Sequence, residues 1–285
     1  MPPSPTVASW ALGRRLRERR RERGLTGPAA ARLTGVTAAY LSDVETGKKR
    51  ISEQRLETLL EHYGFGDTEL PELRELRLEA SSRGWWADYS TVFDDDLLKF
   101  FGYEHGATSV WAYDGGVVNS LLQTEDYARA VLGAADATRR EPELDRRVRC
   151  RMRRQHRLTD DVPLRLRVVM SEAAVRQCVG GHEVLAGQLR HLLDVTHRHA
   201  DTLDVRIVPF DVPGHPAMGG ATFHLMRFGS QRLPTLLWHE SVTASQLISD
   251  PEKVREHARA HEAATAAALS REESFHLVRR HYDRL

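Results

Sequence analysis

The first 64 residues contain short helix-length segments separated by glycines and by capping residues. Residues 8–23 carry no proline and place Leu12 and Leu16 four apart, which predicts a helix with a narrow apolar stripe and a wide cationic face. Thr26 can cap a second helix at 28–34, and Gly35 allows the tight turn that follows it. The sequence therefore predicts that this region is all-helical.

The next segments continue the pattern. Thr37 is expected to cap a third helix at 38–46, with Leu41 and Val44 facing inward and Gly47 ending it. Ser52 is expected to cap a fourth helix at 53–63, and a fifth helix follows within 66–84. Short helices with a glycine-centred turn between the second and the third have the outline of a helix-turn-helix.

The residues themselves closely resemble the XRE/Cro-repressor family of helix-turn-helix DNA-binding modules over about 55 residues. The resemblance is carried by Leu16-Arg17, Gly24-Leu25-Thr26, Ala30-Ala31-Arg32-Leu33-Thr34-Gly35-Val36-Thr37, Tyr40-Leu41-Ser42-Asp43-Val44-Glu45-Thr46-Gly47 and Lys48-Lys49-Arg50. It implies a lambda-repressor-like domain that docks its third helix in the major groove of double-stranded DNA, as a homodimer on inverted repeats.

The resemblance and the residue types together give a set of candidate DNA-binding residues. Small side chains at the start of the third helix allow close approach to bases, polar ones reach base edges, and basic ones beyond the helix and on the first helix reach phosphates. The candidates are Thr26, Thr37, Ala38, Ala39, Tyr40, Ser42, Asp43, Lys48, Lys49, Arg50, Arg14 and Arg17. One departure is Gly27, because family members usually carry Gln there. The alternative is a helix-turn-helix retained as a dimerisation or docking module.

Charge is distributed unevenly along the 285 residues. The net charge is +1, but residues 1–65 hold 12 Lys or Arg against 7 Asp or Glu, which suits a nucleic-acid-binding head on a mildly acidic body. No apolar run is long enough for a membrane span, and the start lacks a secretion signal, so we expect a soluble cytoplasmic protein. Only Cys150 and Cys178 occur, which argues against a disulfide framework.

The boundary between head and body is expected near 81–84, which gives a DNA-binding domain at 1–80 and a regulatory domain at 81–285. Nine of the 20 aromatic residues lie between 85 and 113, where they form either a pocket or the start of a second core. In the body, the sequence pattern predicts strands at 164–170, 203–210, 222–228 and 233–240. It also predicts one helix that begins after the cap Thr124 and further helices at 141–157, 172–178, 182–199, 251–268 and 270–282. The arginine-dense helix at 141–157 reads as solvated surface with salt bridges. The fold class is therefore α+β, an all-α head followed by a larger domain with a small sheet.

The body resembles a second family, a domain of unknown function that follows XRE modules in antitoxin-like regulators of actinobacteria. The resemblance covers roughly residues 80–280 and is carried by Gly84-Trp85-Trp86, Leu121-Leu122-Gln123-Thr124-Glu125-Asp126-Tyr127, Ser171-Glu172-Ala173-Ala174, Val208-Pro209-Phe210, Gly214-His215 and Met218-Gly219-Gly220. It implies a body that binds a small partner protein, often encoded nearby, or an unidentified ligand. The candidates for that contact are Trp85, Trp86, Tyr89, Trp111, Tyr113, Gln123, His215 and Met218.

The competing hypothesis is an enzyme or non-DNA ligand-binding protein with a pocket in the body. His215 is the best candidate for acid–base chemistry, but no nucleophile, phosphate-loop or dinucleotide motif accompanies it. The spacing of His197, His199 and His215 does not support a metal site. We therefore expect a sequence-specific transcriptional regulator without catalytic activity, cofactor or metal.

Overall fold

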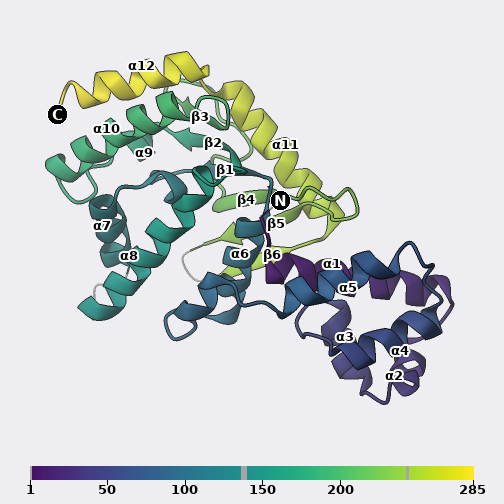
Figure 1. The fold of residues 1–285 in the computed structure, drawn as a ribbon. Coiled ribbons are helices and arrows are strands. Elements are labelled where there is room, and N and C mark those ends of the chain that lie inside the picture. The colour runs from purple at the N-terminus through teal and green to yellow at the C-terminus, as the bar shows by residue number, and fades with distance from the viewer. Residues whose placement is uncertain (1, 136–139, 242–243) are drawn as a thin grey trace. The chain divides into compact units, whose positions relative to one another are not determined.

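A computed structural model describes residues 2–135, 140–241 and 244–285 of the chain (Figure 1). The chain divides into two compact units, Pro2–Ala87 and Asp88–Leu285. The first unit is built from helices, and the second combines helices with a six-stranded sheet. The predicted α+β fold class is confirmed.

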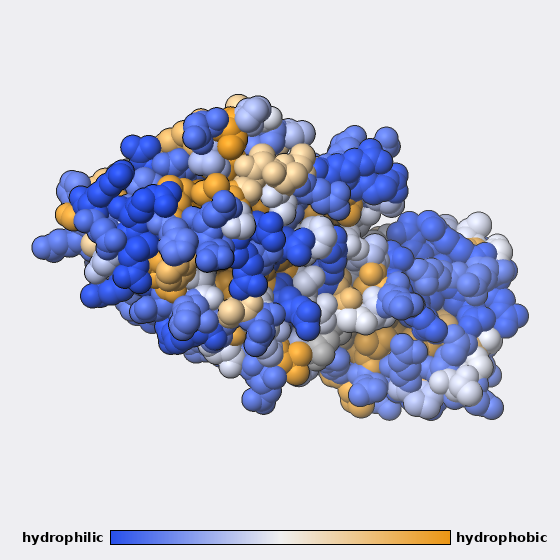
Figure 2. Space-filling view, turned by 90° about the horizontal axis from the view of Figure 1, so that it is seen from above, coloured by the Kyte–Doolittle hydropathy of each residue, from blue (hydrophilic) through white to orange (hydrophobic). Residues whose placement is uncertain are grey.

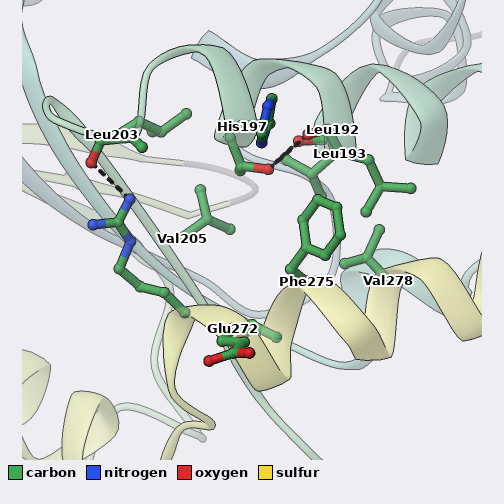
Figure 3. Close-up of a pocket in the computed structure, with 12 residues that line it drawn as sticks. Leu192, Leu193, His197, Leu203, Val205, Glu272, Phe275 and Val278 are labelled. Atoms are coloured by element: carbon green, nitrogen blue, oxygen red, sulfur yellow. Dashed lines mark hydrogen bonds between the residues drawn. The ribbon is translucent and has the colours of Figure 1, made fainter.

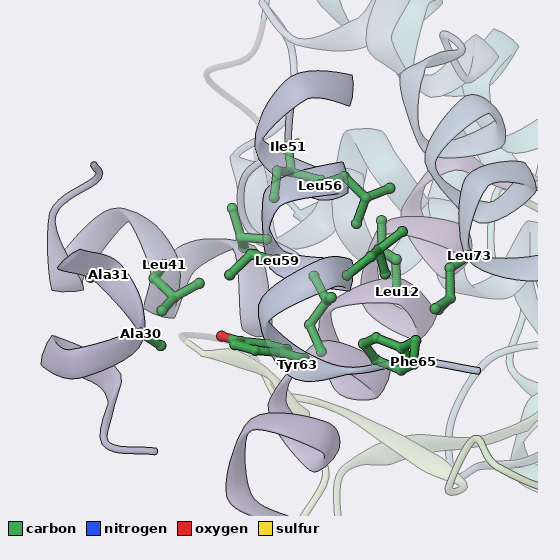
Figure 4. Packing of buried hydrophobic residues seen from close by; sticks show 13 residues of the cluster. Leu12, Ala30, Ala31, Leu41, Ile51, Leu56, Leu59, Tyr63, Phe65 and Leu73 are labelled. Carbon is green, nitrogen blue, oxygen red and sulfur yellow. The ribbon is translucent and has the colours of Figure 1, made fainter. Parts of the chain in front are cut away.

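Five α-helices form the first unit: α1 (Pro5–Glu22), α2 (Gly27–Leu33), α3 (Ala38–Glu45), α4 (Glu53–Tyr63) and α5 (Leu70–Ser81). Leucines from α1, α3, α4 and α5 converge on one core around Tyr63 (Figure 4). Helix α1 begins three residues before its predicted start because the Ser4 hydroxyl accepts a hydrogen bond from the Val7 amide at 3.4 Å. Ser52 precedes α4 as predicted, but its side chain makes no capping hydrogen bond.

Part of the wide cationic face that the sequence suggested for α1 turns inward, whereas Arg17 and Arg21 remain exposed. The Arg15 side chain is buried and its guanidinium donates to Glu69 at 2.5 Å and to Glu72 at 3.4 Å. Arg20 pairs with Glu45 of α3 in the same inward manner. Carboxylates more than 20 residues away in the sequence therefore turn these arginines toward the core.

The second unit is organised by one mixed sheet of strands β1 (Ser109–Asp114), β2 (Arg165–Ser171), β3 (Leu203–Val208), β4 (Thr222–Arg227), β5 (Leu236–Glu240) and β6 (Ser245–Ile248). The strand order is β3-β2-β1-β4-β5-β6, with parallel pairing among β1, β2 and β3 and antiparallel pairing from β1 through β4 and β5 to β6. Tyr113 lies opposite Phe223, and Ala112 opposite His224. Because side chains alternate along a strand, these pairs mark opposite faces of the sheet.

Each face of the sheet has its own helical cover. On one face Tyr113 and Phe223 share a core with Ala264 of α11 (Pro251–Ala267). On the other face Trp238 stacks on Phe100 of α6 (Asp95–Gly106), with ring centroids 4.6 Å apart and planes at 16°. Helices thus cover both faces of the sheet at its central strands, whereas β2 and β3 keep alternating charged residues such as Arg165, Asp204 and Arg206.

The remaining helices are α7 (Glu125–Ala135), α8 (Glu141–Gln155), α9 (Ala173–Arg176), α10 (His182–Arg198) and α12 (Arg271–Tyr282), with single 3-10 turns at Trp85–Tyr89, Ser120–Leu122 and His156–Leu158. The predicted caps at Thr124, Asp250 and Ser270 all accept amide hydrogen bonds. The sequence did not predict α6, β1 or β6.

Hydrophilic residues dominate the surface drawn in Figure 2, where hydrophobic residues form small areas among them. The exposed large hydrophobic side chains are scattered along the chain, at Leu33, Leu78, Val162, Phe210, Met218 and Leu285. Single exposed hydrophobic residues are normal on a protein surface.

Candidate DNA-binding surface

Helix α3 is fixed at both ends by local interactions that the sequence predicts. The Thr37 hydroxyl accepts from the Tyr40 amide at 3.1 Å, which caps the helix as expected. Gly35 adopts a φ of 64° in the turn before it, a backbone conformation that side chains other than glycine adopt at a cost. Gly47 ends the helix region with a φ of 73°. The helix-turn-helix geometry therefore follows from residues close in sequence.

Close packing against α1 holds α3 in place. Leu41 and Val44 are buried in the core of the unit, as predicted. A Cβ on Gly13 of α1 would lie 2.3 Å from the Val44 carbonyl oxygen, so only glycine permits this approach of the two helices. At the end of α3 the Glu45 carboxylate receives two hydrogen bonds from the Arg20 guanidinium, at 2.5 and 2.8 Å.

The opposite side of α3 is free for contact with a ligand. Thr37, Ala38, Ala39 and Ser42 are exposed, and they occupy the first turn and the outer face of the helix. Tyr40 is half-buried, and its hydroxyl donates to the Arg50 carbonyl oxygen at 2.9 Å. Tyr40 therefore positions the segment after α3, and its ring edge remains available for contact with DNA.

The basic residues beyond α3 differ in what they are free to bind. Lys48 is exposed and has no partner among the described residues. Lys49 lies 3.0 Å from the carboxylate of Asp43, which neutralises the only acidic candidate on the helix. The Arg50 guanidinium donates to the Ser81 and Ser82 carbonyl oxygens at 3.2 and 2.9 Å. Lys48 is thus the unpaired cation here among the described residues, Lys49 is exposed but shares its charge with Asp43, and Arg50 is engaged with the end of α5.

The candidates on α1 and α2 divide in a similar way. Arg17 is exposed with no partner among the described residues, and Arg14 pairs with Glu18 at 3.0 Å on the same helix. Thr26 is exposed and caps α2 by accepting from the Ala29 amide at 3.3 Å. A side chain on Gly27 would meet open space, so the glutamine that relatives carry there would project outward.

Arg55 of α4 belongs to this surface and was missed in the sequence. It is exposed, and its guanidinium lies 5.1 Å from the centroid of the Tyr40 ring, on which Lys49 also bears at 6.0 Å. Helix α4 lies outside the sequence motif of the helix-turn-helix, so the motif did not identify Arg55 as a candidate.

The aromatic candidates for a ligand or partner contact are divided between the two units. Trp85 and Trp86 lie edge to face, with ring centroids 5.8 Å apart, at the end of the first unit. Tyr89 lies in the second unit. Trp111 of β1 stacks on His261 of α11 and carries the Arg227 guanidinium 3.4 Å from its ring centroid.

The other candidates in the body lie on both sides of the sheet. Tyr113 is buried with its ring edge against His215, at a centroid distance of 5.4 Å. Burial lowers the pKa of His215, and its buried Nδ1 has no hydrogen-bond partner among the residues that the structure describes. Met218 is 65% exposed, whereas Gln123 is buried and lines a cavity on the opposite face. The structure therefore brings together Tyr113 and His215 but separates both from Gln123.

Comparison with known protein families identifies both parts of the chain. Residues 97–280 match the model of a family described as a domain of unknown function (DUF5753). The chain belongs to this family. Residues 11–73 match a helix-turn-helix domain, from within α1 to the start of α5, and this match includes every candidate DNA-binding residue. No curated protein and no solved structure matches the chain. The recognised combination of a helix-turn-helix with a domain of unknown function is confirmed, and the helix-turn-helix indicates DNA-binding regulation.

The DUF5753 region contains an apolar pocket of about 320 Å³ between α10, α12 and β3. Leu192, Leu193, Phe275 and Val278 point toward one another across it (Figure 3). Within residues 2–135, 140–241 and 244–285, no three His, Cys, Asp or Glu side chains are grouped as metal ligands. The same ranges contain no helix that is both long and apolar enough to cross a bilayer.

Proposed function

We propose that this protein is a sequence-specific, XRE-type transcriptional regulator that places the first turn of α3 in the major groove of double-stranded DNA. The observation that carries the proposal is the exposed start of α3, where Thr37, Ala38 and Ala39 form a narrow, small-residue edge. A major groove about 12 Å wide admits such a helix, and alanine methyl groups contact thymine methyls there. A DNA-binding regulator of this kind acts in the cytoplasm.

The cations around α3 suit contacts to the phosphate backbone. Lys48, Lys49, Arg17 and Arg55 are exposed on the unit that carries the helix. Phosphate contacts provide affinity and salt dependence, whereas the α3 residues provide the choice of sequence. The reading surface holds no arginine, asparagine or glutamine between Thr37 and Asp43, so we expect sequence choice to rest on methyl contacts and hydroxyl groups.

The further parts of the proposal concern assembly and control. We propose that the protein acts as a homodimer on two half-sites about one helical turn apart, because one α3 contacts only a few base pairs. We propose that the DUF5753 domain receives the input, a small partner protein as in antitoxin-like regulators or a ligand, and that it is not an enzyme. The input must bind better to one arrangement of the heads than to another in order to regulate.

Removal of two lysines tests the assigned phosphate contacts. The double variant Lys48→Ala and Lys49→Ala should bind every duplex more weakly and lower the salt slope of log affinity by about 2, because each lost phosphate contact removes roughly 0.9. Genomic duplexes that the wild-type protein retains are selected first. Their binding is then measured by fluorescence anisotropy at several salt concentrations.

The chain provides a matched control for this experiment. Its other two lysines, Lys99 and Lys253, lie in the second unit, and the double alanine variant at those positions should retain the wild-type slope. An unchanged slope in the Lys48 and Lys49 variant would remove their assigned role. A wild-type protein that binds neither random nor genomic duplexes at low salt would remove the proposed function.

A further inference from the structure

The second unit contains a cavity of about 600 Å³ between the sheet and three helices, α6, α7 and α8. Its size falls in the range typical of sites for small organic molecules. The cavity lies on the sheet face that bears Asp114 and His224, opposite the face covered by α11. Its wall combines apolar side chains, such as Phe93, Leu97 and Leu132, with several charged ones.

The arginines of α8 that face this cavity are not equivalent. The Arg154 guanidinium is buried and donates two hydrogen bonds to Glu104, at 2.7 and 2.8 Å, which neutralise it. Arg147 pairs with Glu143 at 2.9 Å. The expectation of a solvated arginine helix is therefore wrong for this side of α8, because buried carboxylate and carbonyl groups draw the side chains inward.

Arg151 stands out from its two neighbours. Its only hydrogen bond among the described residues goes to the Gln123 side chain oxygen at 2.9 Å, although a guanidinium has five N–H donors. No described carboxylate lies within ion-pair distance of it. Burial and, to a smaller extent, the charge of Arg154 lower the pKa of Arg151 to about 10, although the Glu240 carboxylate acts in the opposite direction. Arg151 is half-buried, and Glu240 and Glu104 influence it only from beyond ion-pair distance. A largely desolvated cation without a close counter-charge is costly, so we expect an anion in the cavity to complete its pairing.

Two more polar side chains in the cavity wall make fewer hydrogen bonds, among the described residues, than their atoms can form. The His224 side chain is 4% exposed, and its buried Nδ1 has no hydrogen-bond partner within the part of the chain that the structure describes. The carboxyl of Asp114 receives one hydrogen bond, from the Asn119 amide at 2.8 Å, and burial raises its pKa to about 7. Unpaired buried polar groups that line a cavity are the usual sign of a site that a ligand completes.

We propose that this cavity binds a small organic anion with an apolar body, whose acidic group pairs with Arg151 and whose body packs against Phe93, Leu97 and Leu132. A second polar group of the ligand meets His224 and Asp114. The proposal rests on the proposed function, because it names the class of ligand that serves as the input. The pocket in Figure 3 is a poorer candidate, since its lining is mostly apolar and its charged side chains, Arg271 and Glu272, are exposed to solvent.

A fluorescent aromatic sulfonate, 8-anilinonaphthalene-1-sulfonate, provides both the anion and the apolar body. Titration of the full chain should show one saturable site. Arg151→Met should weaken binding about tenfold or more, because a hydrogen bond between charged groups is lost. The matched control is Arg149→Met on the same helix, which removes an exposed arginine outside the cavity wall and should leave affinity unchanged.

A second variant tests the cavity without changing the charge of its wall. Val131→Trp of α7 places a large ring in the cavity and should abolish the saturable signal. Thermal unfolding checks that each variant is folded. The proposal is overturned by the absence of saturable binding to the wild type, by equal affinity of Arg151→Met, or by a signal that survives Val131→Trp.

DNA binding of the same proteins separates the two proposals. Without the probe, Arg151→Met should bind duplex DNA like the wild type, because Arg151 lies in the second unit and not on the α3 surface. Probe binding that depends on Arg151 in a protein without DNA affinity would retain the cavity site and discard the regulator. DNA binding by a protein that lacks Arg151-dependent probe binding would retain the regulator and discard the cavity site.

Discussion

The ion pair between Arg20 and Glu45 fastens the end of α3 to α1, and its removal is expected to loosen the head selectively. The side chains are 11% and 5% exposed, and two hydrogen bonds of 2.5 and 2.8 Å join them. The Glu45→Ala variant leaves the guanidinium buried, with the Leu25 carbonyl as its remaining hydrogen-bond acceptor at 2.8 Å. Breaking one side of such a pair costs about 3–5 kcal/mol.

Hydrogen exchange of the full chain measures this cost within the head. The Leu56–Leu60 amides of α4 lie in the same core, and they should exchange about a hundredfold to several thousandfold faster in Glu45→Ala. The double variant Arg20→Met and Glu45→Leu should recover most of the protection, because apolar residues of similar volume replace a buried pair at little cost.

An exposed pair of the same unit supplies the control. Glu57 and Arg74 are joined at 2.7 Å but are 40% and 51% exposed, so Glu57→Ala should change the free energy of unfolding by less than about 1 kcal/mol. The reasoning is refuted if the Glu45 and Glu57 variants exchange at the same rate, or if the double variant is as unprotected as Glu45→Ala.

Two further substitutions test the packing of α3 and the acid sensitivity of the body. Gly13→Ala should lower head stability and weaken DNA binding together, because its Cβ would lie 2.3 Å from the Val44 carbonyl oxygen; an unaltered anisotropy titration would contradict this. Burial lowers the pKa of His261 from 6.5 to about 4, so the unfolded chain binds a proton that the folded chain does not, and stability falls as the pH drops from 6.5 to 4. This loss amounts to about 3 kcal/mol, and His261→Gln should flatten urea-denaturation stability over that range. Other buried histidines leave a residual slope, and an unchanged slope would exclude His261 as a cause.

The helix-turn-helix could be predicted because its determinants are local. Thr37 caps the helix that follows it, Gly35 makes the turn before it, and Leu41 with Val44 marks its buried face. Each of these effects acts within a few residues, so it leaves a pattern that the sequence shows directly.

The missed elements of the body have non-local determinants. Strand β1 is buried on both faces, so its residues alternate between two apolar environments and not between core and solvent. Helix α6 carries Phe100 and Phe101 within the aromatic-rich stretch, which has no clear helical period. Strand β6 has four residues and lies at the sheet edge, which is too short to give a pattern.

The cavity was beyond prediction for a related reason. Gln123 was selected for its resemblance to relatives, but its partner Arg151 lies 28 residues away, and Asp114 and His224 come from different strands. The one-sided placement of Arg147, Arg151 and Arg154 on α8 was visible in the sequence. The role of these arginines depends on Glu104, which forms a close ion pair with Arg154 and not with Arg151.

The charge of the head shows how tertiary pairing changes what a residue count implies for DNA binding. Extending the count from residues 1–65 to the unit that ends at Ala87 adds the acidic residues of the α5 region, giving 15 Lys or Arg against 12 Asp or Glu. Arg15 and Arg20 are paired within the unit and cannot also serve phosphates. One head therefore presents fewer free cations than its residue count implies, and fewer phosphate contacts give weaker binding at physiological salt. Under the proposed function, two heads on one operator are needed for useful affinity, which is a physical reason for a dimer.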